Sequence, residues 1–206
     1  LGEIPKGWGV GTLADLATLN PESRSRASRP VTIQYVDLSN TKWGHIESVT
    51  TYERDDAPSR AQRVLRPGDT IVGTVRPGNG AYALVADEGL TGSTGFAVLR
   101  PQRPEYIEFV YLAATPAENI EALAHLADGG AYPAVRPEVV ASTQVVRAPD
   151  AVFVAFSNAA SLPLLRMSAS ERESRTLAAL RDTLLPKLVS GELRVKDASK
   201  VVGATE

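Results

Sequence analysis

The sequence predicts an α+β fold, in which a β-rich domain with short helices is followed by a C-terminal helical region. Up to about residue 149, glycine or proline interrupts the chain about every eight to twelve residues, as in small β-rich domains. Beyond that point, apolar residues recur at helical spacing. With 206 residues, 43% of them hydrophobic, the chain can form one core domain with an appendage. We therefore expect a domain at 1–150, a helical region at 151–192 and a flexible tail at 193–206.

Short apolar runs between turn signals predict the strands of the domain. The motif Arg66–Asp69 (RPGD) has proline second and glycine third, which predicts a turn. The loop RPGNG at 76–80 separates two apolar runs, which predicts a hairpin. The predicted strands are residues 31–38, 46–52, 70–75, 81–86 and 96–100, the last following the glycine-rich segment 89–95.

Helical patterns predict the remaining elements. Residues 105–114 and 117–126 each begin near a proline, which suits the first turn of a helix. Asp150 can cap a further helix that Pro163 is expected to kink or end, because proline lacks an amide donor. A capping box at 168–171 (SASE) predicts that a last helix starts there. Leucines 177, 180, 184 and 188 then share one face, and Gly191 ends the helix.

The overall charge does not indicate a dedicated nucleic-acid binder. The chain has 22 basic and 24 acidic residues, a formal net charge of −2. Phosphate contacts would therefore have to come from local clusters, such as Arg24, Arg26 and Arg29, which no acidic residue interrupts. Acidic neighbours dilute a second arginine cluster at residues 54, 60, 63 and 66. Solvated loops are an equally good interpretation of both clusters.

The chain has little material for catalysis or for metal binding. It contains no cysteine and only two histidines, so thiolate metal sites and histidine-based triads are not expected. The segment GNGAYA at 78–83 matches a nucleotide-binding fingerprint only superficially, because it falls in a hairpin rather than before a helix. We found no phosphate-binding loop, amino-methyltransferase motif or nuclease motif. No apolar run of eighteen residues and no signal-peptide pattern occurs, so we expect a cytoplasmic protein that does not enter a membrane.

The loops instead carry side chains suited to reading base edges. Arginine can bond guanine in a bidentate manner, asparagine can bond adenine, and serine or threonine can bond either base. The same residues are common in loops generally, so they do not identify DNA binding without further support. Together with the phosphate-contact arginines, the candidate DNA-binding residues are Arg24, Arg26, Thr41, Lys42, Trp43, Arg76, Asn79, Ser93, Thr94, Tyr132 and Arg136.

Six segments, in order, resemble the specificity subunits of type I restriction-modification systems. The opening LGEIPKGWGVGTLADLA is similar to the start of a target-recognition domain in that family, and IQYVDLSNTKWGHI to its next strand and loop. LRPGDTIVGTVRPGNGAYALV with TGSTGFAVLRP resembles its central hairpin and following strand. GGAYPAVRPEVVASTQVVRAP is similar to the closing segment, and TLLPKLVSGELRVKDA to the end of the conserved helical spacer. The resemblance covers almost the whole chain.

The chain departs from the family pattern in two ways. Family members usually continue after the closing proline with an unbroken helix, whereas Pro163 interrupts that stretch here. Family members also carry two recognition domains and two spacer helices, whereas this sequence has one of each. We expect either a natural half-subunit that dimerises or half of a longer subunit.

The resemblance implies a non-catalytic DNA-reading subunit. It would need no cofactor, because S-adenosylmethionine would bind the partner modification subunit, the methyltransferase. The expected partners are double-stranded DNA, the modification subunits, a restriction subunit and a second copy of the chain. The dimer or partner interface would use Phe156, Leu177, Leu180, Leu184 and Leu188.

An isolated amphipathic helix cannot bury its apolar stripe, whereas two antiparallel copies can. A helix over 168–188 would span about 30 Å and set the spacing of two DNA half-sites. The alternative function is a protein-interaction adaptor whose C-terminal helix pairs with a partner unrelated to DNA, and a lone enzyme ranks third.

Overall fold

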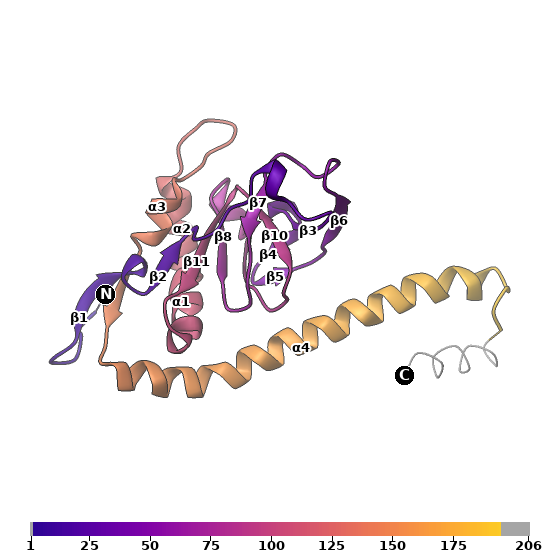
Figure 1. The fold of residues 1–206 in the computed structure, drawn as a ribbon. Helices are drawn as coiled ribbons and strands as arrows, with labels where there is room; N and C mark the ends of the chain where they lie inside the picture. Colours follow the sequence, from indigo (N-terminus) through magenta and orange to yellow (C-terminus); the bar gives the residue numbers. More distant parts are fainter. Residues whose placement is uncertain (1, 195–206) are drawn as a thin grey trace. The chain divides into compact units, whose positions relative to one another are not determined.

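The computed structural model describes residues 2–194 and divides the chain into two units, residues 1–164 and 165–206. Unit 1 holds every strand and the shorter helices (Figure 1). The long helix α4 (Asp150–Val189) starts in unit 1 and continues into unit 2. The predicted fold class, a β-rich region with short helices before a helical region, is confirmed. The predicted tail lies outside the described residues from residue 195 onward.

Unit 1 is built on two four-stranded sheets. The first has the order β2-β11-β8-β9 and is antiparallel throughout. Its strands are β2 (Ala17–Leu19), β11 (Phe96–Pro101), β8 (Thr70–Gly73) and β9 (Tyr82–Leu84). The second has the order β6-β3-β10-β7, in which β10 and β3 run parallel. Its strands are β6 (Thr50–Glu53), β3 (Thr32–Val36), β10 (Leu90–Ser93) and β7 (Ala61–Val64).

Two small ribbons complete the strands. One pairs β1 (Gly9–Thr12) with β12 (Gln144–Arg147), so it joins the start of the domain to the segment that leads into α4. The other pairs β4 (Thr41–Lys42) with β5 (His45–Ile46) and packs beside β9. The short 3-10 helices are η1 (Leu13–Asp15), η2 (Arg26–Ser28), η3 (Leu38–Asn40), η4 (Pro77–Asn79) and η5 (Pro104–Tyr106).

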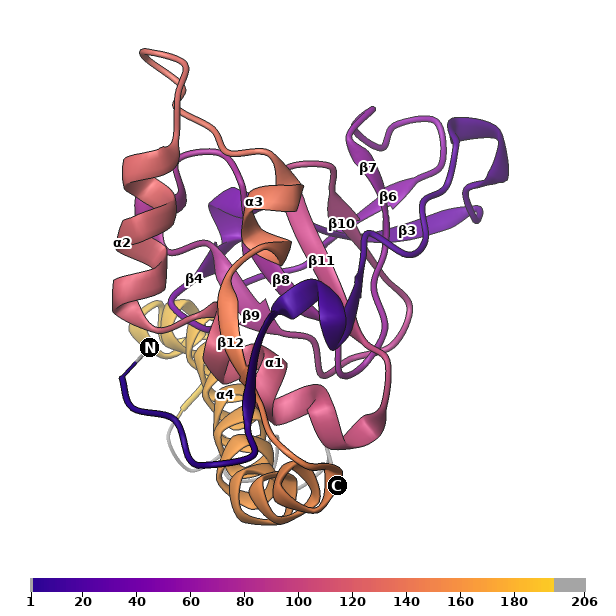
Figure 2. The same ribbon diagram turned by 90° about the vertical axis from the view of Figure 1, so that its left-hand side faces the viewer.

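Both faces of the first sheet are buried, and successive side chains of a strand point to opposite faces. In β11, Ala97 and Leu99 face the helices, whereas Phe96 and Val98 belong to a separate cluster with β3, β9 and β10 residues. Helix α1 (Ile107–Ala114) packs on β8 and β11, α3 (Pro137–Ala141) packs on β11 and β2, and α2 (Ala117–Leu126) packs on α1 and η4 (Figure 2). The first face therefore forms a sheet-and-helix core.

Most sequence predictions for unit 1 are confirmed. The predicted hairpin forms between β8 and β9. Gly68 has a φ of 88°, and the Asp69 amide donates to the Arg66 carbonyl at 3.0 Å, so RPGD makes a turn of the kind that needs glycine third. The structure adds β10, within the glycine-rich segment 89–95, for which we predicted no strand.

Pro163, which we expected to kink or end the helix, does not end it, and the prediction that a new helix starts at 168 is wrong. Helix α4 runs without a break from Asp150 to Val189, a span of 40 residues or about 60 Å. Proline removes one amide donor, and the strong helix formers on either side maintain the helix through it. The helix ends as predicted, because Gly191 adopts a φ of 75° and its amide bonds the Leu188 carbonyl at 3.2 Å.

Candidate functional site

Five of the predicted DNA-binding residues line one concavity of about 500 Å³ in unit 1. They are Arg76, Asn79, Ser93, Thr94 and Tyr132. They come from the turn after β8, the end of β10 and the loop between α2 and α3. The other lining residues are Asp37, Leu38, Ser39, Arg60, Val75, Ala81 and Gly95. The fold thus brings together polar side chains that lie almost a hundred residues apart in sequence.

Arg76 joins the hairpin to the loop between α2 and α3. It adopts the left-handed conformation (φ 48°, ψ 61°), and its amide donates to the Pro133 carbonyl at 2.7 Å. Its Nη2 donates to the Ala131 carbonyl at 2.7 Å, and its Cζ lies 4.6 Å from the centre of the Tyr132 ring. Tyr132 itself is 70% exposed. Arg76 therefore holds the aromatic ring of a residue that lines the concavity.

Trp43 lies against the other side of the same turn. Its amide donates to the Gly80 carbonyl at 2.6 Å, and its ring packs edge-on to Tyr82 with centroids 6.1 Å apart. A Cβ at Gly80 would lie 2.6 Å from the indole, so only glycine permits this approach. Trp43 remains 56% exposed, and neighbouring Lys42 lies 3.9 Å from the Glu47 carboxylate. Both residues stay accessible beside the concavity.

Arg60 and Asp37 also line the concavity, although neither is among the predicted DNA-binding residues. The Arg60 Nη2 donates to Asp37 Oδ2 at 2.7 Å, and its Nε donates to the Tyr35 hydroxyl at 3.1 Å. These partners raise the pKa of Arg60, the Tyr35 hydrogen bond most strongly, while burial raises the pKa of Tyr35. Only tertiary structure places Arg60 here, because it lies in the loop that leads to β7, 23 residues beyond Asp37.

Two predicted readers, Thr41 and Ser93, are buried and cannot reach a nucleic acid in this structure. Thr41 is 0% exposed, and its hydroxyl donates to the Asp37 carbonyl at 3.0 Å. Ser93 is 1% exposed and accepts a hydrogen bond from the Gly95 amide at 3.3 Å. Both side chains lie on short strands that the fold buries, which loop composition alone could not indicate. Thr94 is half-buried, and its backbone amide donates to the Arg60 carbonyl.

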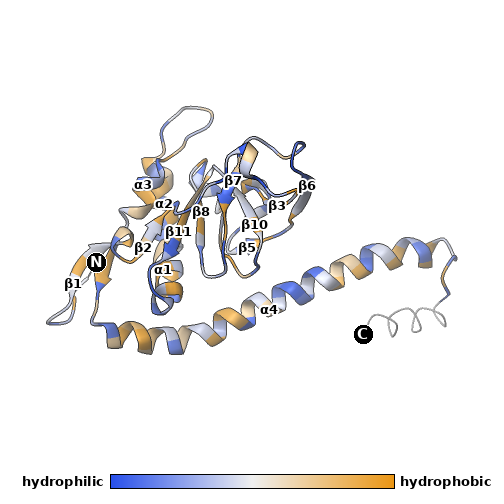
Figure 3. Ribbon diagram, in the orientation of Figure 1, coloured by the Kyte–Doolittle hydropathy of each residue, from blue (hydrophilic) through white to orange (hydrophobic). Residues whose placement is uncertain are grey.

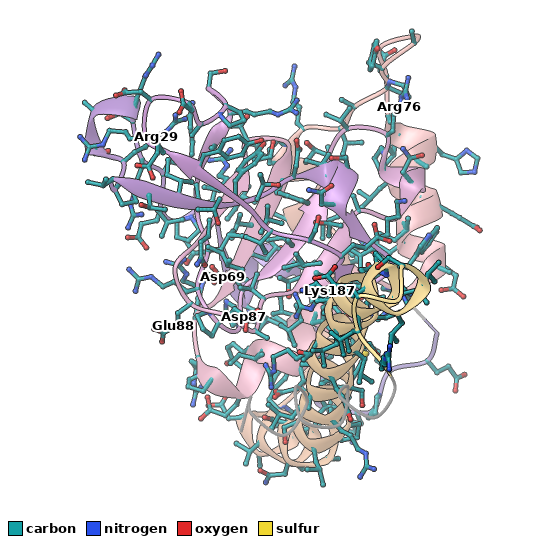
Figure 4. The ribbon with its side chains drawn as sticks, turned by 90° about the vertical axis from the view of Figure 1, so that its right-hand side faces the viewer. Arg29, Asp69, Arg76, Asp87, Glu88 and Lys187 are labelled. Carbon is teal, nitrogen blue, oxygen red and sulfur yellow. The ribbon has the colours of Figure 1, made fainter. Side chains whose placement is uncertain are left out.

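The arginines of the cluster at 24–29 do not line the concavity, and they differ in exposure and in their contacts. Arg29 is 3% exposed and donates to the Pro58 and Ser59 carbonyls at 2.9 Å, so it is a structural residue. Figure 4 places it at the opposite side of unit 1 from Arg76. Arg26 is exposed and lies 3.7 Å from the Asp55 carboxylate, and Arg24 is half-buried. Arg136 is exposed at the start of α3.

A second charged cluster secures the RPGD turn. Arg100 forms a two-pronged contact with the buried Asp69, with Nε–Oδ1 at 2.9 Å and Nη2–Oδ2 at 2.8 Å. Its Nη1 donates to Glu22 at 2.8 Å, and Arg66 reaches the same carboxylate at 2.7 Å. The hydrogen bond from Arg100 is the main reason that the pKa of Glu22 lies below its usual value. Because these charges satisfy one another, the cluster is structural.

The predicted interface residues of α4 fall in both units. Phe156 is half-buried in unit 1, where its ring packs edge-on to Phe109 of α1 at 5.7 Å. Leu177 is 58% exposed, and Leu180, Leu184 and Leu188 are half-buried. Figure 3 shows apolar positions interleaved with polar ones along α4. An 18-residue window of α4 has a mean hydropathy of 1.2. By length and composition alone, the helix could therefore cross a membrane. A single helix of this kind is weak evidence for a membrane span, because helices of soluble proteins pass the same test.

Comparisons with known proteins point to one class of protein. The specificity subunit of the type I restriction enzyme HindI, from Haemophilus influenzae, is 29% identical over 111 residues, which are 52% of this chain and 24% of that protein. The crystal structure of the HsdS subunit from Thermoanaerobacter tengcongensis superposes with a TM-score of 0.56 at 30% identity, over 89% of this chain and 48% of that one. No protein-family profile matches the chain.

Two further solved structures have the same fold. One comes from work on complex assembly and conformational transition of the type I restriction-modification system; its TM-score is 0.59 at 27% identity, over 91% of this chain and 49% of that one. The specificity subunit from M. genitalium matches with a TM-score of 0.54 at 15% identity, which supports the fold alone. This chain spans about half the length of these solved relatives. The resemblance to type I specificity subunits is confirmed.

Proposed function

We propose that this chain, which resembles about half of a type I specificity subunit, is the DNA-reading component of a type I restriction-modification complex. The concavity carries the proposal, because side chains that can bond base edges converge there from three segments. One copy would read one half-site of a bipartite target. A scaffold that presents polar side chains from fixed strands and turns suits this task.

The proposed partners are double-stranded DNA, methyltransferase subunits and a second copy of the chain, with a restriction subunit in systems that cleave. Exposed and half-buried leucines on α4 support protein contacts, since an apolar stripe is stabilised by burial against a second helix. Catalysis and S-adenosylmethionine binding would belong to the methyltransferase, as would extrusion of the target base. The complex would act in the cytoplasm, with no membrane contact.

The direct test is sequence-selective binding. The chain would be co-expressed with its modification subunit, methylated adenines would be mapped in cells, and the purified complex would be titrated with duplexes that carry or lack the mapped site. We expect preferential binding to the mapped site and binding that weakens as salt rises. Equal affinity for both duplexes would contradict the proposal and favour a protein-interaction adaptor built on α4.

Arg76 is the sharpest single-residue prediction at this site. Arg76→Ala should weaken discrimination at one base position by about 1–3 kcal/mol, because a guanidinium on a rigid turn can meet guanine in the major groove. Methylation would be scored on every single-base variant of the mapped target. If methylation falls equally on all variants, Arg76 acts only by holding Ala131 and Tyr132.

Arg26→Ala, which would remove a phosphate contact, should weaken binding evenly across sequences.

A further inference from the structure

The concavity contains an arginine, Arg60, whose orientation is fixed by hydrogen bonds to two partners. Arg60 donates from Nε to the Tyr35 hydroxyl at 3.1 Å and from Nη2 to Asp37 Oδ2 at 2.7 Å. The other Asp37 oxygen, Oδ1, accepts from the Leu38 amide at 2.7 Å, so the carboxylate is itself held in place. Tyr35 is 3% exposed, whereas the Arg60 side chain is 59% exposed. Rigid partners thus hold an accessible guanidinium.

The two occupied donors lie on the same edge of the guanidinium. Nε–H and one Nη2–H form the side edge of the planar group, while Nη1–H and the second Nη2–H form its end. Nη1 makes no hydrogen bond with any residue that the structure describes. The end edge therefore keeps two parallel donors, and this is the edge that matches the O6 and N7 acceptors of guanine.

The paired acid argues for a base rather than a phosphate as the target of this edge. A phosphate contact depends mainly on positive charge and tolerates many orientations. Asp37 offsets much of the Arg60 charge at 2.7 Å, which weakens attraction to a phosphate. The same carboxylate keeps the two remaining donors aligned, which is what a base edge requires. Both Asp37 oxygens are engaged within the chain, so Asp37 orients Arg60 and does not contact a base itself.

We infer that Arg60 is a specificity-determining residue that recognises a guanine in the major groove, and that Asp37 and Tyr35 are its positioning residues. The inference rests on the proposed DNA-reading function and assigns one base type to one side chain. The prediction for Arg76 is separate from this one, because Arg76 is held by Ala131 and Tyr132 and not by Asp37 and Tyr35.

The test uses the assembled complex and a duplex panel with every single-base change in the mapped target. Arg60→Lys keeps the positive charge but removes the two parallel N–H donors of the guanidinium. The preference for guanine at one position should therefore fall about 5- to 150-fold. Asp37→Asn and Tyr35→Phe should reduce preference at that same position by a smaller factor. Arg66→Lys is the matched control, because Arg66 is also 59% exposed and acid-paired but lies outside the concavity. The control should leave every preference unchanged.

Each outcome decides a separate point. If the wild-type complex shows no sequence preference, the proposed function fails before Arg60 is tested. If the wild type is selective and Arg60→Lys keeps the full guanine preference, the Arg60 assignment is wrong. Uniform loss of affinity in Arg60→Ala, with a reduced salt dependence, would make Arg60 a phosphate contact instead. Thermal unfolding of Asp37→Asn and Tyr35→Phe separates a change in preference from a loss of folded protein.

Discussion

At the scale of single residues, backbone strain gathers at the candidate site. In the described part of the chain, the non-glycine residues with positive φ are Asn20, Trp43 and Arg76, and the last two flank the hairpin turn after β8. The left-handed conformation costs about 1–2 kcal/mol for such residues. Because strain of this kind is tolerated where the surrounding structure imposes it, its position supports a functional turn. The sequence offers no local signal for either residue.

The contact between Gly80 and Trp43 gives a stability prediction. Gly80→Ala should lower the free energy of unfolding by about 2–3 kcal/mol, since the new methyl would meet the indole at 2.6 Å and the residue has a φ of 68°. Gly89→Ala is the control: its φ is 78°, but nothing lies within 4 Å of the added Cβ, so only about 1 kcal/mol is expected. Urea denaturation of both variants measures the difference. Equal losses of unfolding free energy in the two variants would contradict the prediction and would show that the Trp43 side chain shifts to make room for the methyl group.

The Glu22 carboxylate gives a pH prediction. Its pKa is lowered in the folded chain, mainly by the Arg100 hydrogen bond, so its stabilising contribution is present at neutral pH. That contribution is lost as pH falls from about 4.5, the usual value, through the lowered folded value. Wild type should therefore be more stable than Glu22→Gln at pH 7, and the difference in stability should shrink as the pH falls below about 4.5. A gap that stays constant with pH in urea titrations would contradict the assignment.

At the scale of elements, sequence patterns predicted the helices and the hairpin whose formation depends on residues close together in the sequence. The β8–β9 hairpin, α1 and α2 follow from a turn motif, alternation and prolines at helix starts. Strand β10 does not, because Gly92 within it and the flanking Gly89 and Gly95 disfavour a strand, and it forms between β3 and β7, which are distant in sequence. The five residues lining the concavity were predictable as polar loop positions. The burial of Thr41 and Ser93 and the pairing of Arg60 required the tertiary fold.

Helix α4 gives an assembly prediction. Leu180→Asp with Leu184→Asp should abolish association with a second copy or with the modification subunits, because charges would enter the apolar stripe. Unit 1 should stay folded, since both leucines lie outside it. Light scattering of the chain alone and co-expressed measures assembly. Ala179→Asp with Thr183→Asp adds the same charge to the other side of the same turns and should leave assembly intact. A wild type that is monomeric under both conditions would refute the prediction.

At the scale of the whole molecule, two features support the proposed role of a DNA reader that would leave catalysis to partner subunits. The concavity is lined by side chains suited to hydrogen bonding, and the charged cluster around Arg100 is satisfied internally. The overall negative charge limits indiscriminate attraction to DNA, so binding must depend on specific contacts. Selectivity would come from geometry more than from bulk electrostatics.

This division of labour gives a prediction for the purified chain. Without partners, it should show no methyl transfer, DNA cleavage or ATP hydrolysis, since its sequence contains none of the motifs for those reactions that we sought. Incubation with labelled S-adenosylmethionine and target duplex tests the first reaction. Adding the modification subunit is the positive control and should restore transfer. Turnover by the chain alone would place the chemistry in this protein.

The main-chain bonds around the hairpin turn have a consequence for engineering. Segments 41–46, 74–80 and 128–135 are joined by the bonds from Trp43 N to Gly80 O, Arg76 N to Pro133 O and Val135 N to Thr74 O. All three bonds join main-chain atoms, and the first also requires a glycine at position 80. A transplanted segment whose backbone follows a different path would lose its bonds to the neighbouring segment, whereas a graft of all three would preserve them. Retargeting should therefore succeed either by exchanging side chains on the fixed backbone or by moving the three segments as one block.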